Sequence, residues 1–171
     1  ILMTVGGGNA RSAVLLKKWI DSVKFSSNTL YPIHAVCGPL MSSEDKAMLR
    51  HSATDGIVLH DSVSDLDHLM QKCRAVVCMG GYNTLVEALS LRKPVLAFSS
   101  GTHEDQHFQI NRYSECGLLI KGDANWSPSQ IAQAIDALAD FVPSSGMSTD
   151  GAARTAEIVN EIWLAAQEYA G

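Results

Sequence analysis

The sequence has no long hydrophobic run and no cluster of basic residues. Its longest apolar stretches, Ala75–Met79 and Pro94–Phe98, have the length of a β-strand, far short of the roughly 18 residues of a membrane span. The 13 Lys and Arg residues are scattered singly apart from Lys17–Lys18, and 18 Asp and Glu give a formal net charge of −5. Because duplex-binding proteins gather cations on one surface, nucleic acid is not expected as a main partner. A nucleotide stays open, since backbone N–H groups can hold phosphate.

Closely paired cysteines and an N-terminal signal are also missing. Cys37, Cys73, Cys78 and Cys116 form no Cys-x-x-Cys pair, which argues against a zinc ribbon or a thioredoxin-like site. We expect buried, reduced thiols in a cytoplasmic protein. The chain has no initiator Met and no signal-peptide pattern, and it opens in what reads as the middle of a strand. We therefore expect the C-terminal part of a longer polypeptide.

What is present is an alternation of short apolar runs with longer amphipathic ones. The 171 residues are 46% apolar, which suits one domain over 1–171 with a substantial core. The predicted strands are Ile1–Val5, Tyr31–Cys37, Gly56–His60, Ala75–Met79, Pro94–Phe98 and Gly117–Ile120. The predicted helices are Ser12–Val23, Ser43–His51, Ser64–Lys72, Asn83–Leu91, Asp105–Cys116, Pro128–Phe141 and, after a linker at Val142–Asp150, the final Gly151–Tyr169. The inward face of the first helix is expected to carry Val14, Leu15, Trp19 and Val23. The order predicts an α/β fold with a six-stranded parallel sheet and helices on both faces.

Ligands of such sheets bind beyond the carboxyl ends of the strands. The first strand is followed by Gly6-Gly7-Gly8-Asn9, where glycines expose backbone N–H groups and admit a phosphate. The spacing does not match the dinucleotide-binding fingerprint, because Arg11 stands where the last glycine belongs. It does not match a P-loop either. The alternative is a tight turn that binds no ligand.

The fourth strand is followed by a second glycine pair, Gly80-Gly81, and another helix. Asn83 or Thr84 is expected to cap that helix. Glu87 lies one turn further on the same face, where a carboxylate could bind the two vicinal hydroxyls of a ribose. The alternative is simple capping with a solvated Glu87.

The fifth strand leads to a polar stretch that contains His-Glu-x-x-His, from His103 to His107. We reject the zinc-protease interpretation because the motif follows a glycine-containing loop, and Tyr113 stands where the extended motif has its third histidine. No metal site is expected. Asp105 and Gln106 suit sugar hydroxyls better, although Asp105 as a helix cap beside a solvated Gln106 is the alternative.

Together these residues resemble a known family. The tract from Met79 to Glu87, followed by Lys93-Pro94 and Asp105-Gln106, resembles the donor-binding signature of two-domain (GT-B) glycosyltransferases. It is similar to that of the family 28 enzymes, which include the peptidoglycan N-acetylglucosaminyl transferase, and of the UDP-glucuronosyltransferases. The plant pattern His-Cys-Gly-Trp-Asn-Ser-x-x-Glu also matches, with Pro94 seven residues later. The resemblance extends from Gly6 to about Ile120 and implies the Rossmann-like, three-layer αβα C-terminal half of a GT-B fold.

The resemblance also implies roles for residues. Those near the donor diphosphate would be Gly7, Gly8, Asn9, Gly81, Asn83 and Thr84. Ser62 and Val63 would face the nucleobase, Glu87 would bind the ribose, and Asp105, Gln106 and His107 would contact the donor sugar. Met79 stands where family members often have His or Arg, so the cationic contact to the diphosphate is missing there, and Arg11 is the candidate to replace it.

The implied function is binding of a nucleotide-sugar, a UDP-sugar, for an inverting and metal-independent transfer of a hexosyl group to an acceptor hydroxyl. No cofactor is implied, since the UDP-sugar is a substrate. The general base and the acceptor site would belong to an N-terminal domain, which could also make peripheral membrane contact, so this chain alone should be inactive. Two alternatives stay open: a UDP-sugar hydrolase or epimerase of the same architecture, and a non-catalytic nucleotide-sugar-binding subunit that works with a partner chain.

Overall fold

The computed structural model describes residues 1–26, 31–99, 104–144 and 150–169. The strands are β1 (Leu2–Thr4), β2 (Ile33–Val36), β3 (Ile57–His60), β4 (Val76–Met79), β5 (Val95–Phe98) and β6 (Ile120–Gly122). The helices are α1 (Ala10–Ser22), α2 (Ser43–Ser52), α3 (Leu66–Lys72), α4 (Tyr82–Ser90), α5 (Glu104–Glu115), α6 (Pro128–Ala137) and α7 (Gly151–Tyr169), with a 3₁₀ turn at Val23–Phe25. All strand pairs are parallel, so the predicted six-stranded α/β fold is confirmed.

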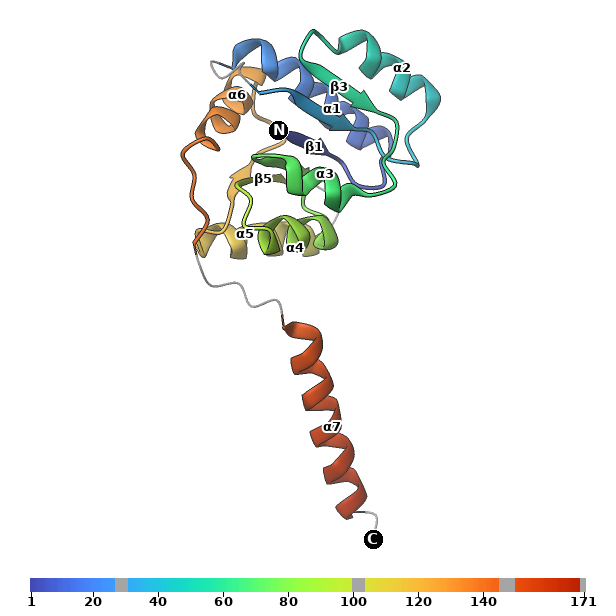
Figure 1. Cartoon of the computed structure of the whole chain (residues 1–171), viewed down its shortest axis with the longest axis vertical. Coiled ribbons are helices and arrows are strands. Elements are labelled where there is room, and N and C mark those ends of the chain that lie inside the picture. The colour runs from blue at the N-terminus through green and yellow to red at the C-terminus, as the bar shows by residue number, and fades with distance from the viewer. Residues whose placement is uncertain (27–30, 100–103, 145–149, 170–171) are drawn as a thin grey trace.

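The sheet is wound in both directions from its centre. The strand order is β3-β2-β1-β4-β5-β6, so the chain adds strands on one side of β1, then returns to place β4 on the other. Helices α1, α2 and α6 bury Leu16, Leu49 and Ile131 against one face. Helices α3, α4 and α5 cover the other face, and Figure 1 shows the two groups on opposite sides of the sheet. This is the predicted three-layer arrangement.

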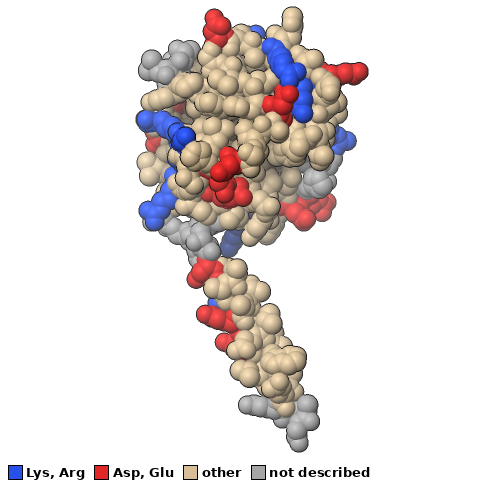
Figure 2. All heavy atoms as spheres, turned by 45° about the vertical axis from the view of Figure 1, so that its right-hand side comes forward, with Lys and Arg blue, Asp and Glu red and all other residues tan. Residues whose placement is uncertain are grey.

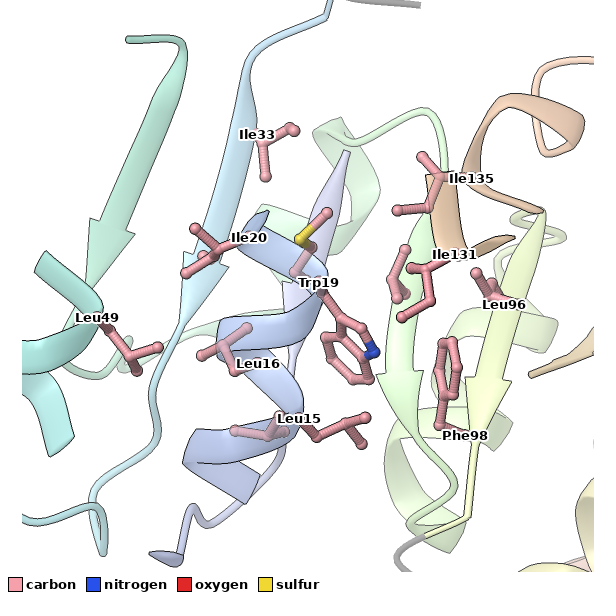
Figure 3. Packing of buried hydrophobic residues seen from close by; sticks show 14 of the residues in the cluster. Leu15, Leu16, Trp19, Ile20, Ile33, Leu49, Leu96, Phe98, Ile131 and Ile135 are labelled. Carbon is pink, nitrogen blue, oxygen red and sulfur yellow. The ribbon is translucent and has the colours of Figure 1, made fainter. Parts of the chain in front are cut away.

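The core of the first face is built around Trp19 of α1. Its ring centroid lies 5.2 Å from that of Phe98 on β5, and both side chains are fully buried (Figure 3). Leu16 and Ile20 flank it on the same helix face. The expected inward position of Val14 is wrong, because Val14 is 66% exposed. The helix settles on the sheet along the line through residues 16 and 20, which rotates residue 14 outward toward the carboxyl edge.

Some predicted boundaries move for local reasons. The sixth strand was expected at Gly117–Ile120 but lies at Ile120–Gly122. Gly117, with φ +68°, ends α5, and the N–H of Leu118 donates to the carbonyl of Tyr113, so these residues close the helix instead of opening a strand. Helix α6 starts at Pro128 as predicted, with Ser127 as its N-cap, but ends at Ala137 instead of Phe141.

Helix α7 stands apart from the other elements. Every residue from 151 to 167 is exposed, and Figure 1 shows the helix projecting away from the sheet and its covering helices. Of the expected linker, residues 145–149 lie outside the described residues. None of the described helices combines the length and apolarity that crossing a membrane requires.

The surface carries mixed charge. On the face that Figure 2 shows, Lys and Arg side chains stand among acidic and uncharged surface instead of forming one broad basic patch.

The thiols of Cys37, Cys73 and Cys78 are buried and free as expected, whereas Cys116 is exposed.

Candidate functional site

Two glycine loops meet where the strand order reverses. Thr4 at the end of β1 pairs with Cys78 of β4, so the loops that follow these strands leave the sheet side by side. The first loop leads to α1 on one face, and the second leads to α4 on the other. In doubly wound sheets such a reversal opens a crevice for ligands at the carboxyl edge. The structure thus brings the predicted positions Gly7, Gly8 and Gly81 to one place.

The loop after β1 is shaped by contact with the loop after β2. Gly8 has φ +79°, and a Cβ there would lie 2.4 Å from the carbonyl oxygen of Cys37. The N–H of Leu40 donates to the carbonyl of Gly7 at 2.8 Å. The side chain of Asn9 caps α1, because its Oδ1 accepts from the Ser12 N–H at 3.0 Å. Packing alone therefore requires Gly8, and the amide oxygen of Asn9 already has a structural partner.

The loop after β4 leaves the start of α4 open. The expected capping by Asn83 or Thr84 is wrong: the helix begins at Tyr82, its N-cap is Gly81, and no side chain caps it among the described residues. The N–H groups of the first turn, those of Tyr82, Asn83 and Thr84, therefore have no partner within the helix. A Cβ at Gly81 would meet nothing within 4 Å, so the approach is clear. An uncapped helix start with free N–H groups favours an anion.

Gly80, the neighbour of Gly81, has a packing role. A Cβ there would lie 2.4 Å from Cδ1 of Ile110 on α5. Lys93, also in the tract that resembles the family signature, donates from Nζ to the carbonyls of Gln71 and Cys73, both at 2.7 Å. Part of this tract therefore holds α3, α4 and α5 together.

Glu87 lies one turn into α4 and is half-buried. Asp67, in the first turn of α3, faces it. Burial, and then the charge of Asp67 and a hydrogen bond with it, raise the pKa of the Glu87 carboxyl above its ordinary value. Sequence reasoning missed Asp67, because nothing local marks a residue on another helix as a neighbour of Glu87.

The predicted nucleobase residues lie in the loop between β3 and α3. Ser62 is exposed, and Val63 packs against the same core cluster as Leu85 of α4. Strand β3 is separated from β4 by β2 and β1. Val63 reaches this cluster because α3, which follows the loop, packs on the second face of the sheet.

The predicted sugar-binding residues lie in the first turn of α5, beyond β5. Asp105 and His107 are exposed and Gln106 is half-buried. His103, the first histidine of His-Glu-x-x-His, lies outside the described residues. Within the described residues, no group of three or more His, Cys, Asp and Glu side chains is placed to hold a metal ion.

The fold occurs in solved glycosyltransferases. MurG of Acinetobacter baumannii matches with a TM-score of 0.67 and 14% identity, over 82% of this chain and 42% of that chain. The calicheamicin glycosyltransferase CalG4 gives a TM-score of 0.63, with 16% identity over 81% of this chain and 33% of that chain. VinC, solved in complex with dTDP, gives a TM-score of 0.61, with 20% identity over 80% of this chain and 33% of that chain.

A curated protein is also similar in sequence. An uncharacterized glycosyltransferase of Methanopyrus kandleri is 28% identical over 163 residues, which are 93% of this chain and 44% of that protein. No family model matches the chain. The chain spans less than half the length of this relative and of the solved structures above. The predicted resemblance to GT-B glycosyltransferases is thereby confirmed, and the chain has the fold of one Rossmann-like part of them.

Proposed function

We propose that this chain is the nucleotide-sugar-binding domain of a glycosyltransferase that uses a UDP-sugar, inverts the anomeric centre and needs no metal ion. The observation that carries the proposal is the uncapped start of α4 behind Gly81, which follows a strand paired directly with β1 and its own glycine loop. The glycosyltransferase relatives support the class of reaction.

The chemistry follows from the helix start. In an inverting transfer, the acceptor oxygen attacks the anomeric carbon, and the bond to the diphosphate oxygen breaks. Negative charge then grows on the leaving nucleoside diphosphate. The N–H groups of Tyr82, Asn83 and Thr84, with the positive end of the α4 dipole, are oriented in advance to stabilise that charge, which is the work a metal ion does in other enzymes.

The remaining contacts position the donor. Glu87 accepts hydrogen bonds from the ribose hydroxyls, and Asp105 and Gln106 hold the sugar, Gln106 as donor and acceptor and Asp105 as acceptor only. The acceptor and the general base belong to the rest of the protein in this proposal. This chain by itself binds the donor without turning it over.

Calorimetric titration of the 171-residue chain with UDP, uridine and a UDP-sugar tests the proposal. Glu87→Ala should weaken the binding of UDP and of uridine alike by about 1–3 kcal/mol, because ribose hydrogen bonds are lost.

Gln106→Ala should weaken only the binding of the UDP-sugar. Glu115→Ala, an exposed carboxylate at the other end of α5, is the matched control, and added chelator should change nothing. Absence of UDP binding, or unchanged UDP affinity in a folded Glu87→Ala variant, contradicts this site.

A further inference from the structure

Asp67 faces the position at which the proposed function places the ribose of the donor. It lies in the first turn of α3, whereas Glu87 lies one turn into α4. A hydrogen bond links the two carboxyl groups. The tract that resembles the family signature begins at Met79, so Asp67 lies outside it and has no role in the proposed function.

The neighbouring aspartate, Asp65, has a local role that Asp67 lacks. Asp65 is the N-cap of α3, and its Oδ1 accepts a hydrogen bond from the His68 N–H at 2.8 Å. The start of α3 is therefore already capped, and capping does not account for Asp67. The carboxyl group of Asp67 is directed to another helix instead, where it meets Glu87.

The two facing carboxylates have no cation between them. Among the ion pairs formed by described residues, none includes Asp67 or Glu87. Burial and the charge of Asp67 raise the pKa of the Glu87 carboxyl, so holding both groups ionised costs free energy. An ionised carboxylate only accepts hydrogen bonds. The ionised pair therefore lacks hydrogen-bond donors, and a ligand that brings two of them suits it.

The pair is also accessible from solvent. Asp67 is exposed and Glu87 is half-buried. Leu66, beside Asp67, and Leu85 of α4 pack in the same core cluster, which anchors both helices on the same face of the sheet. A ligand with two adjacent hydroxyl groups can thus approach both carboxylates at once.

We propose that Asp67 is a second ribose-binding residue, and that Asp67 and Glu87 each accept a hydrogen bond from one of the two vicinal ribose hydroxyls. The inference deepens the proposed function and rests on it, because the ribose is placed at Glu87 there. Asp67 adds an acceptor to that position and is not a separate site. The diol supplies two donors to the ionised pair, whereas a 2′-deoxyribose supplies only one. The pair therefore selects a ribonucleoside diphosphate against its 2′-deoxy counterpart.

Calorimetric titration of the 171-residue chain with UDP, 2′-deoxy-UDP and 3′-deoxy-UDP at pH 7.5 tests this arrangement. Each deoxy compound should bind about 10- to 100-fold more weakly than UDP, because a hydrogen bond to a charged acceptor is lost. In Asp67→Ala, one of the two preferences should fall to about threefold or less while the other is retained. In Glu87→Ala, it is the other preference that should fall.

Two further variants sharpen the comparison. Asp67→Asn keeps an acceptor oxygen but loses the charge, so it should reduce the same preference as Asp67→Ala to a smaller degree. It also carries the test if Asp67→Ala does not fold, which circular dichroism reports. Glu115→Ala removes an exposed carboxylate at the other end of α5 and should retain both preferences.

A merely structural role of Asp67 gives a different pattern. Asp67→Ala would then change the affinities for all three nucleotides equally or not at all, and either result overturns the proposal. Equal affinity of the unmodified chain for UDP and both deoxy compounds overturns it too.

The proposed function fails in a way that can be told apart from failure of this inference. If Glu87→Ala loses both preferences and Asp67→Ala loses neither, both hydroxyls belong to Glu87, which supports the donor site and overturns the role of Asp67. If UDP does not bind to the unmodified chain, the donor site and the role of Asp67 are both overturned.

Discussion

Single glycines at the carboxyl edge have two different roles. Gly8 and Gly80 have no room for a Cβ, which would lie 2.4 Å from Cys37 O and from Ile110 Cδ1, respectively. Gly81 faces open space and is the N-cap of α4. A glycine-rich loop in a sequence therefore combines packing requirements with ligand access, and only Gly81 of these three leaves an anion a free path to the helix N–H groups.

Glu87 yields a prediction about pH. Its pKa is raised above the ordinary value of 4.5, so the folded chain holds this proton more tightly than the unfolded chain does. Protonated Glu87 therefore contributes to the stability of the folded chain. This contribution is complete below the ordinary pKa of Glu87 and is lost as pH rises through its pKa in the folded chain. Glu87→Gln should therefore raise Tm at pH 7.5, by about 2 °C, and have little effect near pH 4.

Thermal unfolding followed by circular dichroism at the two pH values measures this difference. Asp67→Asn removes the facing carboxylate and should act in the same direction, while Glu115→Gln on α5 is the control. A Glu87→Gln variant less stable than the unmodified chain at pH 7.5 would show that its carboxylate is a net stabiliser.

At the scale of elements, β2 and β3 carry a pair of histidines on neighbouring strands. His34 Nδ1 and His60 Nε2 are 3.0 Å apart, and the rings stack with centroids 5.3 Å apart. At this distance a ring N–H of one imidazole can donate to the ring nitrogen of the other, whereas positive charge on both rings would be repulsive. Burial first, then His60 and the N-terminal amine, lower the pKa of His34.

This pair predicts acid sensitivity of the sheet. A lowered pKa means that His34 binds its proton less tightly in the folded chain than in the unfolded chain. Neutral His34 therefore adds to the free energy of unfolding above its ordinary pKa of 6.5, and this contribution is lost as pH falls through the pKa of His34 in the folded chain. Between pH 7.5 and pH 5, the midpoint of urea unfolding should fall less in His34→Gln than in the unmodified chain. His51→Gln, at an exposed position of α2, should retain the full fall, and equal falls in all three proteins would contradict the role of the pair.

At the scale of the whole molecule, stability resides in the sheet and the six helices packed on it. Helix α7 exposes Ile158, Val159, Ile162 and Trp163, and none of its residues from 151 to 167 is buried. A chain that ends at residue 144 should therefore unfold within about 1 °C of the full chain in a calorimetric scan. Ile131→Ala, which empties a fully buried position of α6, should cost about 2–5 kcal/mol as the contrasting case. A clearly lower Tm of the shortened chain would show that α7 stabilises the fold.

The sequence by itself determined the parallel α/β class and several helix starts, because both depend on short-range patterns. Alternating apolar runs define buried strands, and the caps Ser42 and Ser127 act within one turn of their helices. It misplaced the sixth strand and the inward face of α1, since neither Gly117 nor Val14 shows in a local pattern how its helix meets the sheet.

Only the tertiary structure decided where the strand order reverses, because β1 and β4 pair across more than 70 residues of chain. The same long-range packing places Asp67 beside Glu87, and Arg11 in one pocket with Met79. It also leaves the start of α4 uncapped, because the helix begins at Tyr82 and its N-cap residue, Gly81, has no side chain. The family-like tract marked the part of the chain that forms the candidate site, but contacts between distant elements decide which groups meet there, and those contacts do not exist until the sheet has formed.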